Sequence, residues 1–227
     1  MAHDGIYRVN VLKENNMKVL LVNGSPHEHG CTDTALSEVA KTLNEEDVTT
    51  EFFWIGTKPI AGCIGCFKCA ERRQCVFPDR VNEFTKLAAD FDGFVFGSPV
   101  YYAGMNGGLM SFMDRAFYSA SAQEPHPFRF KPAAAVVSAR RAGTTSALDQ
   151  MNKYFLHGQM PIISSRYWNM VHGNTPEEVR QDAEGLQIMR VLGRNMAWFL
   201  RLREAGEKAG ISLPVQEETR IATNFIG

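Results

Sequence analysis

Four of the five cysteines in this 227-residue chain lie close together, and they are the residues whose spacing most strongly indicates chemistry. Cys63, Cys66, Cys69 and Cys75 stand at relative positions 0, 3, 6 and 12. Spacers of two residues allow neighbouring thiolates to point at one soft metal centre. Thiols this close in sequence are poorly placed to pair with one another, and Cys31 is the one cysteine left over. The cluster therefore predicts redox or metal chemistry, not a disulfide scaffold.

The elements that must position these thiols alternate between strands and helices. Strand patterns cover residues 18–22, 49–54, 93–96, 133–137 and 160–163. Helical periodicity covers residues 34–43, 81–91, 106–118 and 146–156, and a longer helix is expected from Thr175 to about Ala205. This alternation predicts an α/β fold, with a doubly wound five-stranded parallel sheet and helices on both faces.

The order of these elements suggests how the chain is divided. We expect residues 1–16 to be an N-terminal extension and residues 17–165 to form the main domain, with the cysteine loop at 59–78. Residues 166–227 are expected to be a helical extension and tail that belong to the same domain.

Composition and charge exclude several classes of function. The net charge is −1, which gives no electrostatic reason to bind nucleic acid or an anionic membrane. No apolar stretch approaches the roughly 20 residues that span a bilayer. The polar N-terminal segment has no apolar core of a secretion signal. We therefore expect a cytoplasmic protein.

Three segments that follow predicted strands have unusual sequences. Ligands of open α/β sheets bind at the carboxyl ends of the strands. Residues 23–34 combine hydroxyls and glycines with the start of a helix, which is a pattern suited to a phosphate. This segment contains neither a Gly-Lys-Ser/Thr motif nor Gly-x-Gly-x-x-Gly, so it favours a mononucleotide over a nucleoside triphosphate or a dinucleotide. The alternative is an ordinary polar turn with a capped helix.

The second segment could present backbone and aromatic edges to a flat ring, and the third is also unusual in sequence. Residues 97–104 bracket two tyrosines with proline and glycine, and residues 138–144 combine small residues with two arginines. The alternative for the tyrosines is a role in an interface. Three such segments at one edge of the sheet are stronger evidence for a ligand site than any one of them.

These motifs resemble those of a known family. The matching residues are Gly24-Ser25-Pro26, Cys31-Thr32, Gly97-Ser98-Pro99-Val100-Tyr101 and Asp114-Arg115. Over about residues 17–165 the chain resembles the NAD(P)H-dependent FMN reductase branch of the flavodoxin-like superfamily. The cysteine cluster resembles that of the iron–sulfur flavoproteins in the same branch.

The resemblance implies an FMN site built from all three segments. The phosphate would lie against Ser25, His27, Thr32, Thr34 and the backbone near Cys31. The residues that would surround the flavin ring are Pro99, Val100, Tyr101, Ala103 and Gly104, with Arg140 and Gly143 on the far side.

Two residues of this set depart from the family pattern. His27 stands where the family often has arginine, and either donates to the phosphate or is a solvated loop residue. Cys31 stands where the family often has asparagine. Its position near a helix start allows either a reactive thiol with a lowered pKa or simply a small residue at a tight turn.

The cysteine cluster has three interpretations. A 4Fe–4S cluster would use all four thiolates, Cys63, Cys66, Cys69 and Cys75, and their spacing matches that of the iron–sulfur flavoproteins. Structural zinc would also use four thiolates, but zinc usually takes two separated pairs. Free thiols that shape a loop near the flavin are the third interpretation.

The family implies an enzyme. We expect an FMN-dependent oxidoreductase that takes electrons from NAD(P)H and passes them to a quinone, a nitro- or azo-aromatic, a flavin or a protein. The alternative is an iron–sulfur flavoprotein that serves as an electron carrier or redox sensor for a ferredoxin-type partner.

Family members usually complete the flavin pocket with a neighbouring subunit, which implies a homodimer or homotetramer. Residues 166–173 and the helix through Met189, Trp198 and Phe199 could supply the contact between subunits, or could equally be core.

Overall fold

A parallel sheet forms the centre of the molecule in the computed structural model, which describes residues 17–215, 218, 221 and 223. The expected extension at residues 1–16 lies outside this described part. Five parallel strands run in the order β2-β1-β3-β5-β6, and a short β4 pairs antiparallel with the end of β3. Their bounds are β1 Lys18–Asn23, β2 Thr49–Trp54, β3 Gly93–Tyr101, β4 Gly104–Met105, β5 Ala133–Ala139 and β6 Met170–His172. The predicted five-stranded parallel sheet is confirmed.

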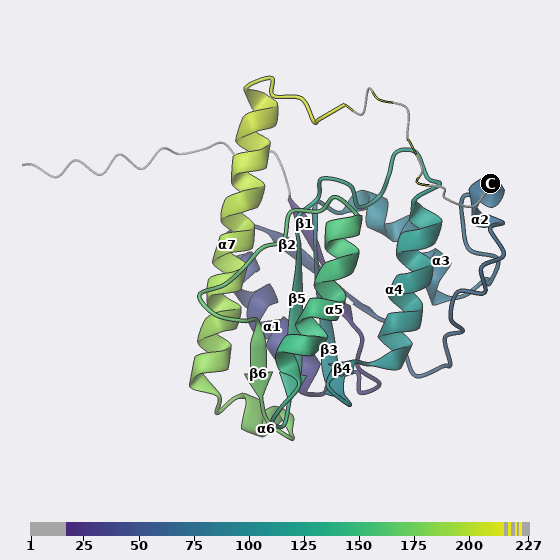
Figure 1. Cartoon of the computed structure of the whole chain (residues 1–227). Helices are drawn as coiled ribbons and strands as arrows, with labels where there is room; N and C mark the ends of the chain where they lie inside the picture. Colours follow the sequence, from purple (N-terminus) through teal and green to yellow (C-terminus); the bar gives the residue numbers. More distant parts are fainter. Residues whose placement is uncertain (1–16, 216–217, 219–220, 222, 224–227) are drawn as a thin grey trace, which may run out of the picture.

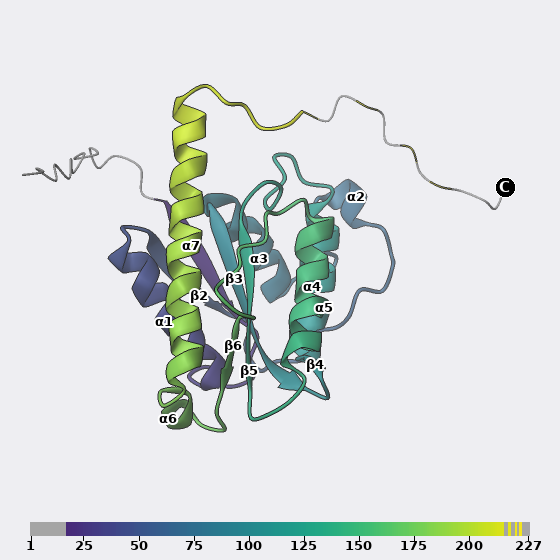
Figure 2. The same ribbon diagram turned by 60° about the vertical axis from the view of Figure 1, so that its left-hand side comes forward.

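Helices cover both faces of this sheet (Figures 1 and 2). One layer consists of α1 Cys31–Glu45, α6 Pro176–Val179 and α7 Ala183–Lys208. The other consists of α3 Arg80–Leu87, the 3-10 turn η1 Ala88–Asp90, α4 Gly107–Ala120 and α5 Thr144–His157. Alternate residues of β1 serve the two layers: Val19 and Leu21 pack with α1 and α7, whereas Leu20 and Val22 pack with the opposite layer. This alternation is the physical basis of the doubly wound fold, which is confirmed.

Two predicted elements differ in the structure. The fifth strand was expected at residues 160–163, but Ile162 makes only an isolated bridge to Ala133, and the strand lies at Met170–His172. Pro161 has no backbone N–H with which to continue a ladder. The single helix expected from Thr175 is two helices, because Asp182 accepts from the Gly185 N–H and starts α7 anew.

Helix α4 runs from the carboxyl end of β3 to the neighbourhood of the cysteine loop. Asn106 caps its start, accepting N–H groups from Gly108 and Leu109 at 2.8 and 3.2 Å, beside the carboxyl end of β3. Its last turns lie beside the short helix α2, Cys69–Arg72, at the opposite end of the molecule from β4 (Figure 1). In the part of the chain that the structure describes, no helix is both long and apolar enough to cross a membrane.

Candidate functional site

The three segments singled out in the sequence meet at the carboxyl edge of the sheet. The Gly24 N–H donates to the Gly97 carbonyl at 2.9 Å, and a Cβ on Gly24 would lie 2.6 Å from Leu109. Gly143 has a φ of +94°, and a Cβ there would lie 2.6 Å from the Cα of Ala103. The segment after β1 thus contacts the one after β3, which in turn contacts the one after β5. Glycine is required at both points of contact.

In the first segment, Ser25 is held in place from three sides. Its N–H donates to Asn23 Oδ1 at 3.0 Å, its carbonyl accepts from Trp54 Nε1 at 2.8 Å, and its Oγ accepts from the His27 N–H at 3.1 Å. Because the hydroxyl oxygen is the acceptor in that last bond, its own hydrogen can be donated to a ligand. Asn23 also donates to the Glu28 carbonyl at 2.8 Å. Asn23 therefore shapes this segment, a role that the sequence analysis missed.

The other residues predicted to bind phosphate are placed in different ways. His27 is exposed, and Thr34 Oγ1 donates to the Gly30 carbonyl at 3.2 Å. Thr32 is buried, and its hydroxyl pairs with Ser138 Oγ at 2.9 Å, at the end of β5. Gly30 caps α1 without a side-chain hydrogen bond, so the first N–H groups of this helix can receive an anion.

Cys31 lies at the start of α1, and its surroundings favour the thiol over the thiolate. Burial raises the pKa of its thiol, and the carboxylates of Glu178 and Glu177 raise that pKa further. The S–H group donates to the Gly173 carbonyl at 3.7 Å. The direction of this pKa shift is opposite to the one that the reactive-thiol interpretation expected, because desolvation disfavours the thiolate. The small-residue interpretation fits these contacts.

The second segment contains a strained two-residue turn between β3 and β4. Tyr102 and Ala103 both have positive φ, at 49° and 60°, which is the pattern of a type I′ hairpin. Tyr101 and Tyr102 are exposed, whereas Gly104 is buried against Gln150. Pro99 and Val100 are half-buried just before this turn. In the third segment Arg140 is exposed and Gly143 contacts Val100 and Ala103.

The four clustered cysteines line one cavity of about 20 Å³ at the other end of α4. Burial raises the pKa of the Cys69 thiol, and the neighbouring Cys66, Cys63 and Cys75 sulfurs raise it further. All of these cysteines are free thiols. Among the described residues, no group of three or more His, Cys, Asp or Glu side chains is arranged to hold a metal ion.

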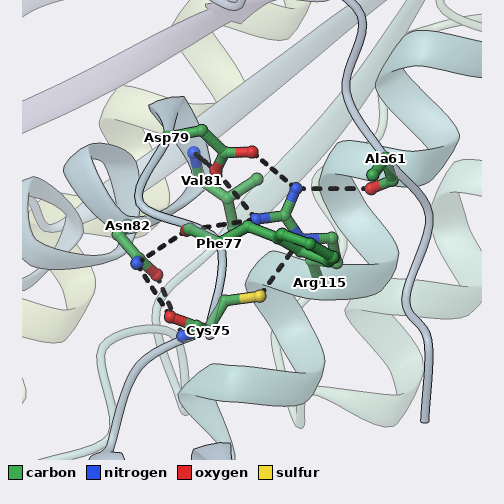
Figure 3. A network of polar contacts seen from close by, with 7 residues as sticks. All are labelled: Ala61, Cys75, Phe77, Asp79, Val81, Asn82 and Arg115. Carbon is green, nitrogen blue, oxygen red and sulfur yellow. Dashed lines mark hydrogen bonds and ion pairs between the residues drawn. The ribbon is translucent and has the colours of Figure 1, made fainter. Parts of the chain in front are cut away.

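A buried arginine borders the same cavity, and Figure 3 shows its polar contacts. Arg115, on α4, donates from Nε to Cys75 Sγ at 3.1 Å. Its two Nη groups bond the carboxylate of Asp79 at 2.7 and 2.8 Å. Asn82 exchanges hydrogen bonds with the backbone of Cys75, both at 2.9 Å. Arg115 belongs to the family motif Asp114-Arg115, but nothing in the sequence predicts its contact with Cys75.

A groove of about 660 Å³ between α4 and α5 joins the neighbourhoods of the two sites. It extends from Met105 and Gln150, beside the β3–β4 turn, to Phe67 and Cys69 in the cysteine loop. Across it, the Tyr154 hydroxyl donates to Asp114 at 2.5 Å. Burial raises the pKa of Tyr154, and Asp114 raises it further, so the phenol stays protonated.

Comparisons with known proteins agree with this arrangement. The sequence matches the NADPH-dependent FMN reductase family over residues 17–175. An iron–sulfur flavoprotein of Methanocaldococcus jannaschii is 32% identical over 193 residues, covering 82% of this chain and 98% of that relative. One from Archaeoglobus fulgidus is 29% identical over 194 residues, covering 81% and 97%. The fold is similar to that of an NAD(P)H:quinone oxidoreductase from Methanothermobacter marburgensis, with a TM-score of 0.61 and 17% identity over 80% of this chain and 100% of that one.

Proposed function

Because this chain belongs to the NADPH-dependent FMN reductase family, we propose that it is an FMN-dependent oxidoreductase that takes electrons from NAD(P)H. The acceptor would be a quinone, a nitro- or azo-aromatic, a flavin or a protein. The observation that carries this proposal is the contact of the three segments after β1, β3 and β5 through Gly24 and Gly143. This contact supports the proposal, because it brings three segments distant in sequence together at the edge where open α/β sheets bind ligands.

The phosphate of FMN would lie at the start of α1. Ser25 would donate its hydroxyl hydrogen, and the first N–H groups of α1 would complete the anion site. His27, exposed at the rim, would add a donor. We assign Thr32 and Thr34 an indirect role, because their hydroxyls hold Ser138 and Gly30. Cys31 would contribute its backbone.

The flavin ring would lie between the second and third segments. Residues that would line it are Pro99, Val100, Tyr101, Ala103 and Gly104, with Arg140 and Gly143 on the far side. FMN, when bound, supplies hydride and single-electron chemistry that no side chain offers. The residues bind and orient the ring, and no acid–base side chain is required of them.

A second candidate is an iron–sulfur flavoprotein that carries electrons to a redox protein. The specific observation in its favour is that Cys63, Cys66, Cys69 and Cys75 line one cavity. Both relatives described above are named iron–sulfur flavoproteins. Four thiolates are the donor set that a 4Fe–4S cluster takes, and here all four border the same cavity. Left-handed Gly65 and Phe67 turn the loop backbone, as in the N–H concavities of iron–sulfur sites.

One sample can test both candidates. Protein purified without oxygen is examined by ultraviolet–visible spectroscopy, with iron and sulfide assays and NADH or NADPH oxidation with a quinone. Flavin absorption with turnover faster than that of free FMN supports the reductase. Flavin with about four irons and four sulfides per chain but no turnover supports the carrier. Failure to bind added FMN contradicts both.

We also propose a homodimer or homotetramer in the cytoplasm. Trp168 and Trp198 are 55% and 58% exposed and could contact a neighbouring subunit. Met189, considered for the same contact, is fully buried against the sheet, and Phe199 packs on the same core. Free thiols suit a reducing compartment. Gel filtration that gives a monomer at micromolar concentration would contradict the oligomer.

A further inference from the structure

We propose that Arg115 is the positioning residue of the cysteine site: it fixes Cys75 and provides a buried positive charge that favours the reduced form of an iron–sulfur centre. This inference rests on the cluster of the second candidate function. It concerns a residue that touches the thiol ligand but not the reacting substrate.

The contacts of Arg115 join both ends of the cysteine loop. Nη1 donates to the Ala61 carbonyl at 3.3 Å, just before the first cysteine. Nη2 donates to the Phe77 carbonyl at 3.4 Å, just after the last one. The guanidinium also lies over the Phe77 ring, 4.8 Å from its centroid. One side chain therefore closes the loop around the thiols.

Cys75 is the cysteine that this network holds. Its sulfur accepts from Arg115 Nε, while Asn82 fixes its backbone N–H and carbonyl (Figure 3). At the other extreme, Cys63 is exposed. Cys75 is thus a ligand whose sulfur and backbone are both held by neighbouring side chains. Partners that orient a metal ligand typically change metal affinity by about 10–100-fold when they are removed.

The charge of Arg115 acts where water does not screen it. The side chain is 1% exposed, whereas Lys68, Arg72 and Arg73 of the same loop are exposed. N–H bonds to ligand sulfurs and local positive charge raise the potential of an iron–sulfur centre, because the reduced form carries more negative charge. Asp79 offsets this charge in part, since it pairs with Arg115 and is 34% exposed.

The opposite charges of this pair make the inference testable. Arg115→Met removes the N–H bond to sulfur and the positive charge, so we expect at least about tenfold weaker iron binding and a lower midpoint potential. Asp79→Asn removes the negative charge, keeps an oxygen to cap α3, and leaves Arg115 beside Cys75. Its midpoint potential should rise. Arg72→Met is the control, because it removes a solvated charge from the same loop and should change neither quantity.

The experiment uses the full chain loaded with iron and sulfide and titrated with dithionite. Circular dichroism and FMN uptake report whether each variant folds, since the predicted flavin edge lies at the other end of α4. If Arg115→Met does not fold, Arg115→Lys, which loses the two-pronged contact, should show smaller changes in the same direction. The inference would be overturned if the midpoint potential moved in the same direction in the Arg115 and Asp79 variants, or if it moved in neither. A wild-type chain that binds no iron and sulfide would overturn the cluster itself.

Discussion

Ser25 is the hydroxyl best placed to meet a phosphate, because its oxygen accepts the His27 N–H and its hydrogen is left for a ligand. A hydrogen bond to a charged group contributes about 1.5–3 kcal/mol, and 1.4 kcal/mol is tenfold in affinity. We therefore expect Ser25→Ala to raise the Kd for FMN about 10- to 100-fold in a fluorescence titration. Ser121→Ala, an exposed serine at the end of α4, is the control. Equal affinities would remove Ser25 from the site.

His126 makes stability depend on pH. Its Nδ1 accepts the N–H groups of Phe128 and Arg129 at 3.1 and 3.0 Å, which requires an unprotonated nitrogen. Burial lowers the pKa of His126, and Arg129 lowers it further. The unfolded chain, in which the histidine pKa is about 6.5, therefore binds the proton more readily than the folded chain does.

The free energy of unfolding should therefore fall as the pH drops below about 6.5 toward the lower folded pKa. His126→Asn keeps an acceptor oxygen but does not titrate, so its loss of stability over this range should be smaller. Urea unfolding at several pH values measures this difference, with His157→Asn, at an exposed histidine at the end of α5, as control. Parallel pH profiles for wild type and His126→Asn would contradict the assignment.

At the scale of elements, the β3–β4 turn stores strain at the predicted flavin edge. Tyr102 has a φ of 49° and a fully exposed side chain. The left-handed backbone therefore costs free energy that no packing of this side chain offsets. Tyr102→Gly should be more stable than Tyr102→Ala by about 1 kcal/mol, since both lose the ring but only glycine loses the Cβ. Thermal unfolding of the two variants is the measurement. Equal stability would show that the turn is not strained.

Elements with a strong local signal could be predicted from the sequence. The run at residues 18–22 is apolar and became β1, and the glycines at 24 and 143 marked the segments that meet at its edge. The strand at Met170–His172 was not predicted, because three residues are too few to show a periodicity. The contacts of Arg115 were not predicted for another reason. They join residue 115 to residues 61, 75 and 79, and no local sequence pattern indicates contacts between residues so far apart in the chain.

At the scale of the whole molecule, α4 separates the two candidate sites. Asn106 stands at the flavin edge and Tyr118 borders the cysteine cavity, which places them about 18 Å apart along the helix at about 1.5 Å per residue. The two apolar cores are built from strands and helices, with no contribution from the four clustered cysteines. We therefore expect the fold to form whatever the cysteines bind.

This separation predicts that each site can be emptied alone. Cys69→Ser should lose iron and sulfide, yet keep the FMN content and change the melting temperature little, because Cys69 lies outside both cores. Ser25→Ala should lower the FMN content and keep iron, since Ser25 follows β1 and contacts Asn23, His27 and Trp54, none of which is in the cysteine loop. Iron, sulfide and flavin assays on the two purified variants measure this reciprocity. Loss of both cofactors in either variant would show that the sites are coupled, as they would be if a second subunit brought the cysteines of one chain to the flavin of another.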